Sequence, residues 1–125
     1  MLEKFRVETQ IAVTDMKRAK EFYEGKLGLV PGGFPFGGVE MFNGAEGTKF
    51  FIYQRETISP ALNTVMSFHV EDIENLVAGL KERGVVFKDY DMADLKTIDS
   101  IATMCPLKSA WFKDPDGNIL ALYQM

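Results

Sequence analysis

The chain ends in the stretch that decides its fold, Trp111-Phe112-Lys113-Asp114-Pro115-Asp116-Gly117-Asn118-Ile119-Leu120-Ala121-Leu122-Tyr123-Gln124-Met125. The centre of this stretch predicts a tight turn, because proline fixes φ, the first aspartate can bond back to the backbone, and glycine accepts a positive φ. Aromatic residues precede the turn and an Ile-Leu-Ala-Leu-Tyr run follows it, which is typical of half-buried strands. The stretch is therefore predicted to form a β-hairpin.

A strand and a helix are predicted at the start of the chain. Residues 5–13 alternate between apolar and mostly polar side chains, a period of two that indicates a strand. Asp15 is a good N-cap, apolar residues then recur at helical spacing, and Gly28 can end the helix. Residues 30–42 are rich in Gly and Pro and predict short strands joined by turns, and residues 49–54 predict a further apolar strand.

The same order of elements returns in the second half. Residues 65–70 alternate, Asp72 repeats the N-cap, Gly84 repeats the helix stop, and residues 85–87 begin another strand. The second copy is longer, and its extra residues fall in segment 89–107, which is hard to assign. That segment is the best candidate for a mobile lid, with disorder as the alternative. Two copies of strand, helix and strands predict an α+β fold with helices on one face of a sheet.

Composition limits the class of protein. A chain of 125 residues is one domain's worth, and its hydrophobic share of 46% and charged share of 26% are ordinary for a globular protein. The net charge of −4 argues against nucleic acid as a partner, and no apolar run approaches the ~18 residues that a membrane span needs. The single cysteine, Cys105, allows no disulfide within the chain, so we expect a cytoplasmic location.

Together these motifs resemble the vicinal oxygen chelate superfamily, which groups glyoxalase I, extradiol dioxygenases, fosfomycin resistance proteins and bleomycin resistance proteins. The resemblance rests on Val13-x-Asp15, Ala19-x-x-Phe22-Tyr23, Leu27-Gly28-Leu29, Phe68-x-Val70-x-Asp72, Leu80-x-x-x-Gly84-Val85 and Phe112-x-Asp114-Pro115-Asp116-Gly117-Asn118. It implies a single domain, residues 1–125, of two βαβββ modules whose strands curl around a shared cavity, with the helices outside. The modules would span about 1–56 and 64–125, with a connector at about 57–63, and family habit implies a homodimer.

In metal-using members of that superfamily, four strands each contribute one ligand to a divalent cation in the cavity. The resemblance places the four ligand positions at Glu8, Phe51, Val65 and Ala121. Only Glu8 could bind a metal there, whereas a catalytic divalent site needs about three protein ligands, commonly His and carboxylate. We therefore expect neither the usual metal site nor a cofactor. An unusual site that uses Glu8, His69 or Cys105 is left open.

One face of the strands is predicted to line the cavity, since strand alternation and the family geometry select the same residues. A concave surface with aromatic walls and a few polar groups is typical of a small-molecule site. The predicted ligand-binding residues are Glu8, Gln10, Phe51, Tyr53, Ser67, His69, Trp111 and Tyr123. Tyr53 and Tyr123 could instead only pack, and the side of the sheet that Trp111 faces is left open. The opposite face is uniformly apolar and should form the core beneath the helices.

Glu8 and His69 are the candidate catalytic residues. A carboxylate among apolar neighbours would be partly desolvated and could act as a base or bind an amine. A histidine on the same surface could bind a substrate carboxylate or move a proton near neutral pH. The alternatives are an exposed strand residue for Glu8 and a hydrogen-bonded structural histidine for His69.

Three functions remain open at this point. The favoured one is a small-molecule-binding protein that needs no divalent metal, as bleomycin resistance proteins are. The alternatives are a glyoxalase- or dioxygenase-type lyase, isomerase or oxygenase, and a metal-free acid–base enzyme that uses Glu8 and His69. The expected partner is a small molecule rather than nucleic acid or a membrane, and the sequence does not identify it.

Overall fold

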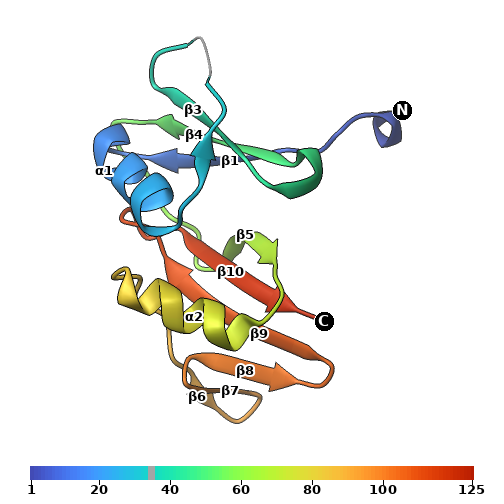
Figure 1. The fold of residues 1–125 in the computed structure, drawn as a ribbon. Helices are drawn as coiled ribbons and strands as arrows, with labels where there is room; N and C mark the ends of the chain where they lie inside the picture. Colours follow the sequence, from blue (N-terminus) through green and yellow to red (C-terminus); the bar gives the residue numbers. More distant parts are fainter. Residues whose placement is uncertain (34–35) are drawn as a thin grey trace. The chain divides into compact units, whose positions relative to one another are not determined.

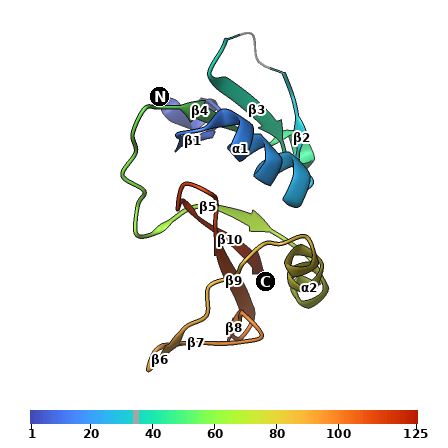
Figure 2. The same cartoon turned by 90° about the vertical axis from the view of Figure 1, so that its left-hand side faces the viewer.

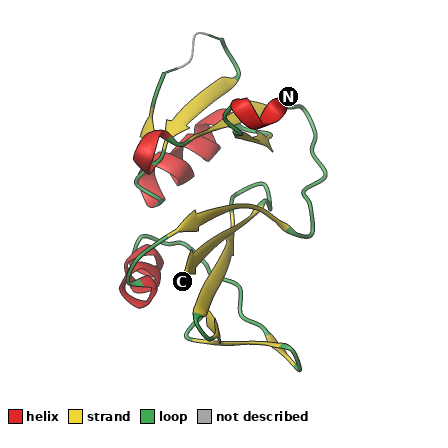
Figure 3. Ribbon diagram, turned by 90° about the vertical axis from the view of Figure 1, so that its right-hand side faces the viewer, coloured by secondary structure: helices red, strands yellow, loops and turns green. Residues whose placement is uncertain are grey.

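The structure, a computed structural model, describes residues 1–33 and 36–125 and divides into two compact units, residues 1–58 (unit 1) and residues 59–125 (unit 2). Each unit is a β-sheet with a helix against one of its faces (Figures 1 and 2). Figure 3 shows how much of each unit is strand and how little is helix. The predicted α+β class is therefore confirmed. Among the described residues no helix is long and apolar enough to cross a membrane.

Unit 1 contains a four-stranded sheet in the order β1-β4-β3-β2, with β1 parallel to β4 and the other neighbours antiparallel. Its elements are η1 (Leu2–Lys4), β1 (Thr9–Val13), α1 (Met16–Lys20), the π-helical η2 (Glu21–Lys26), β2 (Val30–Pro31), β3 (Val39–Asn43), η3 (Ala45–Gly47) and β4 (Lys49–Gln54). The strand predicted at 49–54 is confirmed, and short strands occur in 30–42 as predicted, apart from residues 34–35, which lie outside the described residues.

The first strand is shorter than the predicted 5–13. Thr9 pairs with Phe50, and β4 begins one residue earlier, at Lys49. Before Lys49 the chain is in the turn around η3, so it offers residues 5–7 no strand to pair with. The alternating pattern alone therefore predicted too long a strand, because it included residues that have no neighbouring strand to pair with.

The core of unit 1 is aromatic. Tyr23 is fully buried, and its ring centroid lies 5.8 Å from both Phe42 and Phe50. The helix that carries Tyr23 begins as predicted, because the Asp15 carboxylate accepts a hydrogen bond of 3.1 Å from the Arg18 N–H. It ends as predicted at Gly28, whose φ of +72° lies in the left-handed region that glycine tolerates.

Unit 2 contains a six-stranded sheet in the order β5-β10-β9-β8-β7-β6, with β5 parallel to β10. Its elements are β5 (Thr64–His69), α2 (Ile73–Glu82), β6 (Asp91–Met92), β7 (Leu95–Ile98), β8 (Ile101–Met104), β9 (Leu107–Lys113) and β10 (Ile119–Gln124). The hairpin β9–β10 is the one that the C-terminal stretch predicted, and the helix stop at Gly84 also holds, with φ at +91°.

The turn between β9 and β10 is built around one carboxylate. Asp114 is buried and accepts hydrogen bonds from the N–H of Asp116 (3.0 Å), the N–H of Asn118 (2.9 Å) and the side-chain amide of Asn118 (2.8 Å). Gly117 has the predicted positive φ, at +90°. The turn chemistry that the sequence indicated is therefore confirmed.

Two predictions in unit 2 need correction, and one segment that the sequence left open is now assigned. Asp72 is not a side-chain N-cap: it is left-handed (φ 52°, ψ 56°), and its carboxylate accepts from the Asn75 side chain at 2.7 Å instead of from a helix N–H. Residues 85–87 form no strand, since only Phe87 pairs, as a single bridge to Phe112. Segment 89–107, which the sequence could not assign, forms β6, β7, β8 and the start of β9 (Figure 1).

The predicted helix-side face is mostly confirmed. Its members in β1, β4 and β10 are buried, whereas those at the end of β5 are half-buried. The buried ones are Ile11, Val13, Phe50, Ile52, Leu120 and Leu122, and the half-buried ones are Phe68 and Val70.

Candidate ligand-binding face

The sheet face of unit 2 that lies opposite α2, which we call the open face, collects four of the predicted site residues. Cross-strand partners point to the same side of a sheet. Ala121 of β10 pairs with Ser67 of β5 and with Trp111 of β9, which makes one row. Tyr123 pairs with His69 on one side and with Ser109 on the other, which makes the next row. The register thus settles the facing of Trp111.

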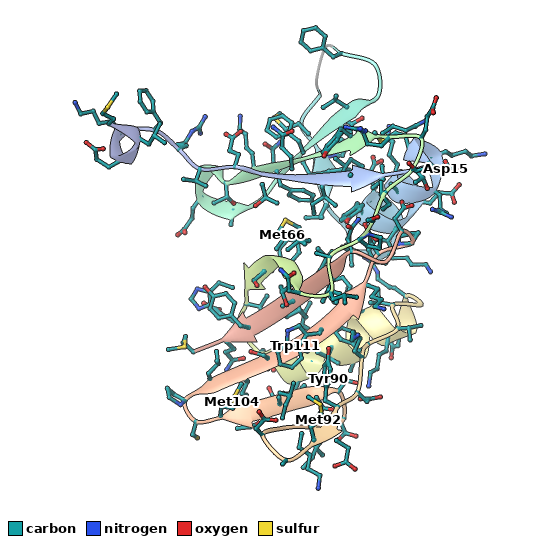
Figure 4. All side chains as sticks on the ribbon, turned by 180° about the vertical axis from the view of Figure 1, so that it is seen from behind. Asp15, Met66, Tyr90, Met92, Met104 and Trp111 are labelled. Atoms are coloured by element: carbon teal, nitrogen blue, oxygen red, sulfur yellow. The ribbon has the colours of Figure 1, made fainter. Side chains whose placement is uncertain are left out.

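Two aromatic pairs flank this surface. The rings of His69 and Tyr123 are stacked, with centroids 4.8 Å apart and planes at 5°. The rings of Tyr90 and Trp111 meet edge to face, with centroids 5.5 Å apart and planes at 86°. Figure 4 shows Tyr90 and Trp111 beside each other, with Met92 and Met104 in the same part of unit 2. His69 is exposed and the other three aromatic residues are half-buried, so they remain partly accessible within this chain.

Small side chains separate the two pairs. Ser67 and Ala121 continue the row of Trp111, while Ser109 and Ala102 continue the row of Tyr123. A flat molecule that lies over Ser67 would therefore meet aromatic side chains in its own row and in the next row. Ser67 and His69 also bring polar groups that can hydrogen-bond to it.

In unit 1, the sheet face opposite the helix carries three more predicted residues. Gln10 pairs with Phe51, and Tyr53 lies two residues further along β4 on the same side. Met41 and Val39 of β3 pair with Phe51 and Tyr53 and extend this surface. Unit 1 thus presents a second half-buried aromatic surface.

Glu8 is placed differently from the other candidates. It lies one residue before β1, its side chain is 28% exposed, and its carboxylate is 3.9 Å from the Arg6 guanidinium. Arg6 therefore supplies a cation beside a carboxylate that the sequence placed among apolar neighbours. Glu8 and His69 belong to different units, so their use as one acid–base pair stays a prediction, as does the cavity that the two modules were expected to share.

Two further members of the open face of unit 2 were missed by the sequence prediction. Ser109 could have been found, because it lies two residues before Trp111 on the same strand and so must share its face. Tyr90 could not, because it lies in the segment that gave no periodic signal. Its place is set by hydrogen bonds to Thr97, whose Oγ1 accepts from the Tyr90 N–H at 2.9 Å.

The donor atoms do not fit the divalent metal that the resemblance implies. Of the four ligand positions, Phe51, Val65 and Ala121 have side chains with no donor atom, which leaves the Glu8 carboxylate. Within residues 1–33 and 36–125, no group of three or more His, Cys, Asp or Glu side chains is placed to hold a metal ion. An open hollow on the outer side of α1 and η2 is lined by surface charges such as Lys20 and Glu24, which pair at 3.9 Å, and it adds no donor set.

Comparisons with known proteins agree with this fold. The chain is 26% identical to the uncharacterized protein YraH of Bacillus subtilis (strain 168), over 95% of this chain and 97% of that protein. It superposes on a glyoxalase / bleomycin resistance protein from Catenulispora acidiphila DSM 44928 with a TM-score of 0.69 and 25% identity, covering 97% and 98% of the two chains. An antibiotic binding protein from Streptomyces sp. CB03234 superposes with a TM-score of 0.67 and 22% identity, covering 94% and 92%.

A sequence model of the Glyoxalase/Bleomycin resistance protein/Dioxygenase superfamily matches residues 6–122, which is nearly the whole chain. The superposition on the Catenulispora acidiphila protein, itself a glyoxalase / bleomycin resistance protein, agrees with that match. The chain therefore belongs to the Glyoxalase/Bleomycin resistance protein/Dioxygenase superfamily.

Proposed function

We propose that this protein binds an aromatic small molecule on the open face of unit 2 and does so without a divalent metal. The observation that carries the proposal is the pair of aromatic contacts, His69 with Tyr123 and Tyr90 with Trp111, on either side of small side chains. Aromatic rings prefer offset-stacked and edge-to-face neighbours, and this surface offers a molecule both kinds of contact. One of the fold neighbours is an antibiotic binding protein, which supports ligand binding as a use of this fold.

The donor set supports the metal-free part of the proposal. Glyoxalase- and dioxygenase-type reactions that use a divalent ion need several ligands on one centre. The family positions in this chain offer one carboxylate, at Glu8, and that carboxylate already lies beside Arg6. A homodimer and a cytoplasmic location belong to the same proposal, and both rest on the sequence.

Trp111 makes the proposal testable, because it is the only tryptophan of the chain and lies on the proposed surface. We would titrate the purified protein with 4-nitrobenzyl alcohol, a neutral aromatic probe whose nitro group quenches indole fluorescence, with and without EDTA. The expected result is saturable quenching that EDTA leaves unchanged. Tyr123→Ala should weaken binding about tenfold, since it removes one aromatic wall while keeping the fluorophore.

The matched control is Phe5→Ala, which removes an aromatic ring that is 68% exposed and lies outside the proposed surface. It should leave the titration unchanged. Quenching that stays linear in probe, as for N-acetyltryptophanamide in solution, would contradict the proposal. So would saturable quenching that Tyr123→Ala does not affect, or that disappears with EDTA.

A further inference from the structure

The open face of unit 2 has an unusual charge balance. The chain has 18 Asp and Glu residues, yet none lies in β5, β8, β9 or β10, the four strands next to the two aromatic pairs. At the far edge of the same sheet, β6 carries Asp91, whose carboxylate lies 3.6 Å from the Lys96 amino group of β7. The basic residues of the four strands are His69, Lys108 and Lys113. Strands generally disfavour acidic residues, so the absence alone says little. The lack of acidic residues matters here because lysine side chains lie beside the same strands.

Two lysines border the open face. Lys113 pairs in register with Ile119, which puts it on the side of Trp111 and Ser109, and it is exposed. Lys88 donates its backbone N–H to the Trp111 carbonyl at 2.7 Å, and its Nζ lies 5.5 Å from the centroid of the Tyr90 ring. The Lys88 amino group therefore lies against the aromatic wall, and Lys113 lies on the same face as Trp111 at the end of β9.

These two amino groups lack acidic partners, whereas the third lysine of the region has one. Lys108 lies on the helix side of β9 and forms an ion pair with Glu74 of α2. Within the part of the chain that the structure describes, neither Lys88 nor Lys113 forms a salt bridge. A ligand on the open face would thus lie near two lysine side chains whose positive charges are not paired with an acidic side chain.

We infer that the ligand is an aromatic anion, such as an aromatic carboxylate or phenolate; this inference rests on the proposed function. The aromatic pairs would hold its ring, and Lys88 and Lys113 would attract its charge. The hydroxyl of Ser67 and the imidazole of His69 can donate hydrogen bonds, and donors of this kind bind ionised acceptors more strongly than neutral ones. A cationic ligand would find no carboxylate on these strands and two like charges beside them.

The test compares three probes that share one ring and differ in charge: 4-nitrobenzoate, 4-nitrobenzyl alcohol and 4-nitrobenzylammonium. Each is titrated against Trp111 fluorescence at pH 7.5 in low salt. The expected order of affinity is anion, neutral, cation, with at least a tenfold difference between the first and the last. The difference should shrink in 0.5 M NaCl, because salt screens exposed charges.

The lysines supply the matched variants. The double change Lys88→Met and Lys113→Met should bring the three affinities within about threefold of one another, because it keeps the side-chain stems and removes both charges. Lys81→Met is the control, since Lys81 is an exposed residue of α2 and lies away from the open face. It should leave the order unchanged.

The outcomes separate the two proposals. Failure of all three probes to bind saturably would contradict the proposed function itself. Saturable binding with no preference for the anion, or a preference that survives the double lysine change, would overturn only the assignment of an aromatic anion.

Discussion

Units 1 and 2 both place the side-chain amide of a glutamine at the N-terminus of their helix. The Gln54 Oε1 accepts from the Met16 N–H at 3.1 Å, and the Gln124 Oε1 accepts from the Ile73 N–H at 2.9 Å. Both glutamines end the last strand of their unit, next to the parallel first strand. The first N–H groups of a helix have no partner inside it, so an acceptor from the neighbouring strand satisfies one of them. Both copies of the repeat therefore have this contact.

The residue just before each helix shows the opposite behaviour. Asp15 and Asp72 occupy the same place in the two copies, but only Asp15 accepts a bond from a helix N–H. Asp72 takes a left-handed backbone and bonds to Asn75. Because α2 has no aspartate cap, we expect it to depend on its glutamine more than α1 does.

The ion pair between helix and sheet also differs, since its charges are exchanged. In unit 1 Lys20 of α1 reaches Glu40 of β3 at 3.5 Å, whereas in unit 2 Glu74 of α2 pairs with Lys108 of β9. The strands β3 and β9 have the same place in their sheets, next to the strand that ends in the glutamine. Either polarity can link a helix to the sheet, so this contact requires opposite charges without requiring particular residues.

The largest expected difference between the units is in the turn before the last strand. Asp114→Ala should lower the free energy of unfolding by about 3 kcal/mol, because it removes a buried carboxylate that accepts hydrogen bonds from the Asp116 N–H, the Asn118 N–H and the Asn118 side-chain amide. In unit 1, Thr48→Ala removes a single exposed hydrogen bond, from Thr48 Oγ1 to the Ala45 carbonyl, and should cost less than about 1 kcal/mol. Urea denaturation of both variants measures the two costs.

Native-state hydrogen exchange would sharpen the same comparison. Asp114→Ala should speed exchange in β9 and β10, and a matched effect on β3 and β4 would show that the units open together. Equal costs for Asp114→Ala and Thr48→Ala would contradict the expectation that the buried carboxylate stabilises its turn more than the exposed hydroxyl does.

The glutamine caps give the next largest effect. Gln124→Ala should cost about 1 kcal/mol and Gln54→Ala about 0.5 kcal/mol, because Gln124 is partly buried and α2 has no aspartate cap, whereas Gln54 is exposed and Asp15 also caps α1. Thermal and urea denaturation measure both. Gln124→Glu is the control: it keeps an acceptor at the same place and adds a negative charge that suits a helix N-terminus. A larger loss for Gln54→Ala than for Gln124→Ala would contradict the comparison.

The sequence correctly predicted those features of the fold that depend on the backbone conformation of one residue or on hydrogen bonds to its near neighbours in the chain. The Asp114 turn, the glycine helix stops and the Asp15 cap are of this kind. The cap predicted at Asp72 is wrong because its backbone is left-handed and its carboxylate accepts from the Asn75 side chain, neither of which the spacing of residues indicates. The strand predicted at residues 5–7 is wrong because a strand needs a neighbouring strand to pair with, and the alternating pattern does not indicate where that neighbour ends.

The candidate site was predictable to a similar degree. Once two strands pair, alternation fixes which residues share a face, and it correctly grouped Ser67, His69 and Tyr123. The sequence left the facing of Trp111 open, and the register of β9 against β10 places it on the same face. Tyr90 was not predicted as a site residue because it lies in a segment without a periodic pattern, so nothing in the sequence indicated that its ring contacts Trp111. Tyr123 and His69 were both chosen from the sequence, but their stacking depends on the parallel register of β5 and β10, which alternation does not contain.

The smallest predicted effect concerns the ion pair of unit 2 and depends on pH. The hydrogen bond from Lys108 is the main cause that lowers the pKa of Glu74 below its ordinary value of 4.5, and the same bond raises the pKa of Lys108 above 10.5. A carboxylate with a lowered pKa stabilises the fold above the unfolded pKa and loses that contribution as the pH falls through the folded pKa. A lysine with a raised pKa contributes below its unfolded pKa and loses the contribution as the pH rises through the folded one.

Glu74→Gln should therefore have a Tm slightly below that of the parent protein between pH 6 and 9, and the gap should close below pH 4.5, where the parent loses its carboxylate charge. Circular dichroism melts at several pH values give the gap directly, and it should stay small because both groups are exposed and surface pairs contribute little. Glu40→Gln makes the same substitution in unit 1, where the carboxylate lies on the sheet instead of the helix. A Tm difference for Glu74→Gln that stays constant down to acid unfolding would contradict this prediction. It would show that the substitution costs packing or helix propensity, and that the charge of Glu74 does not stabilise unit 2.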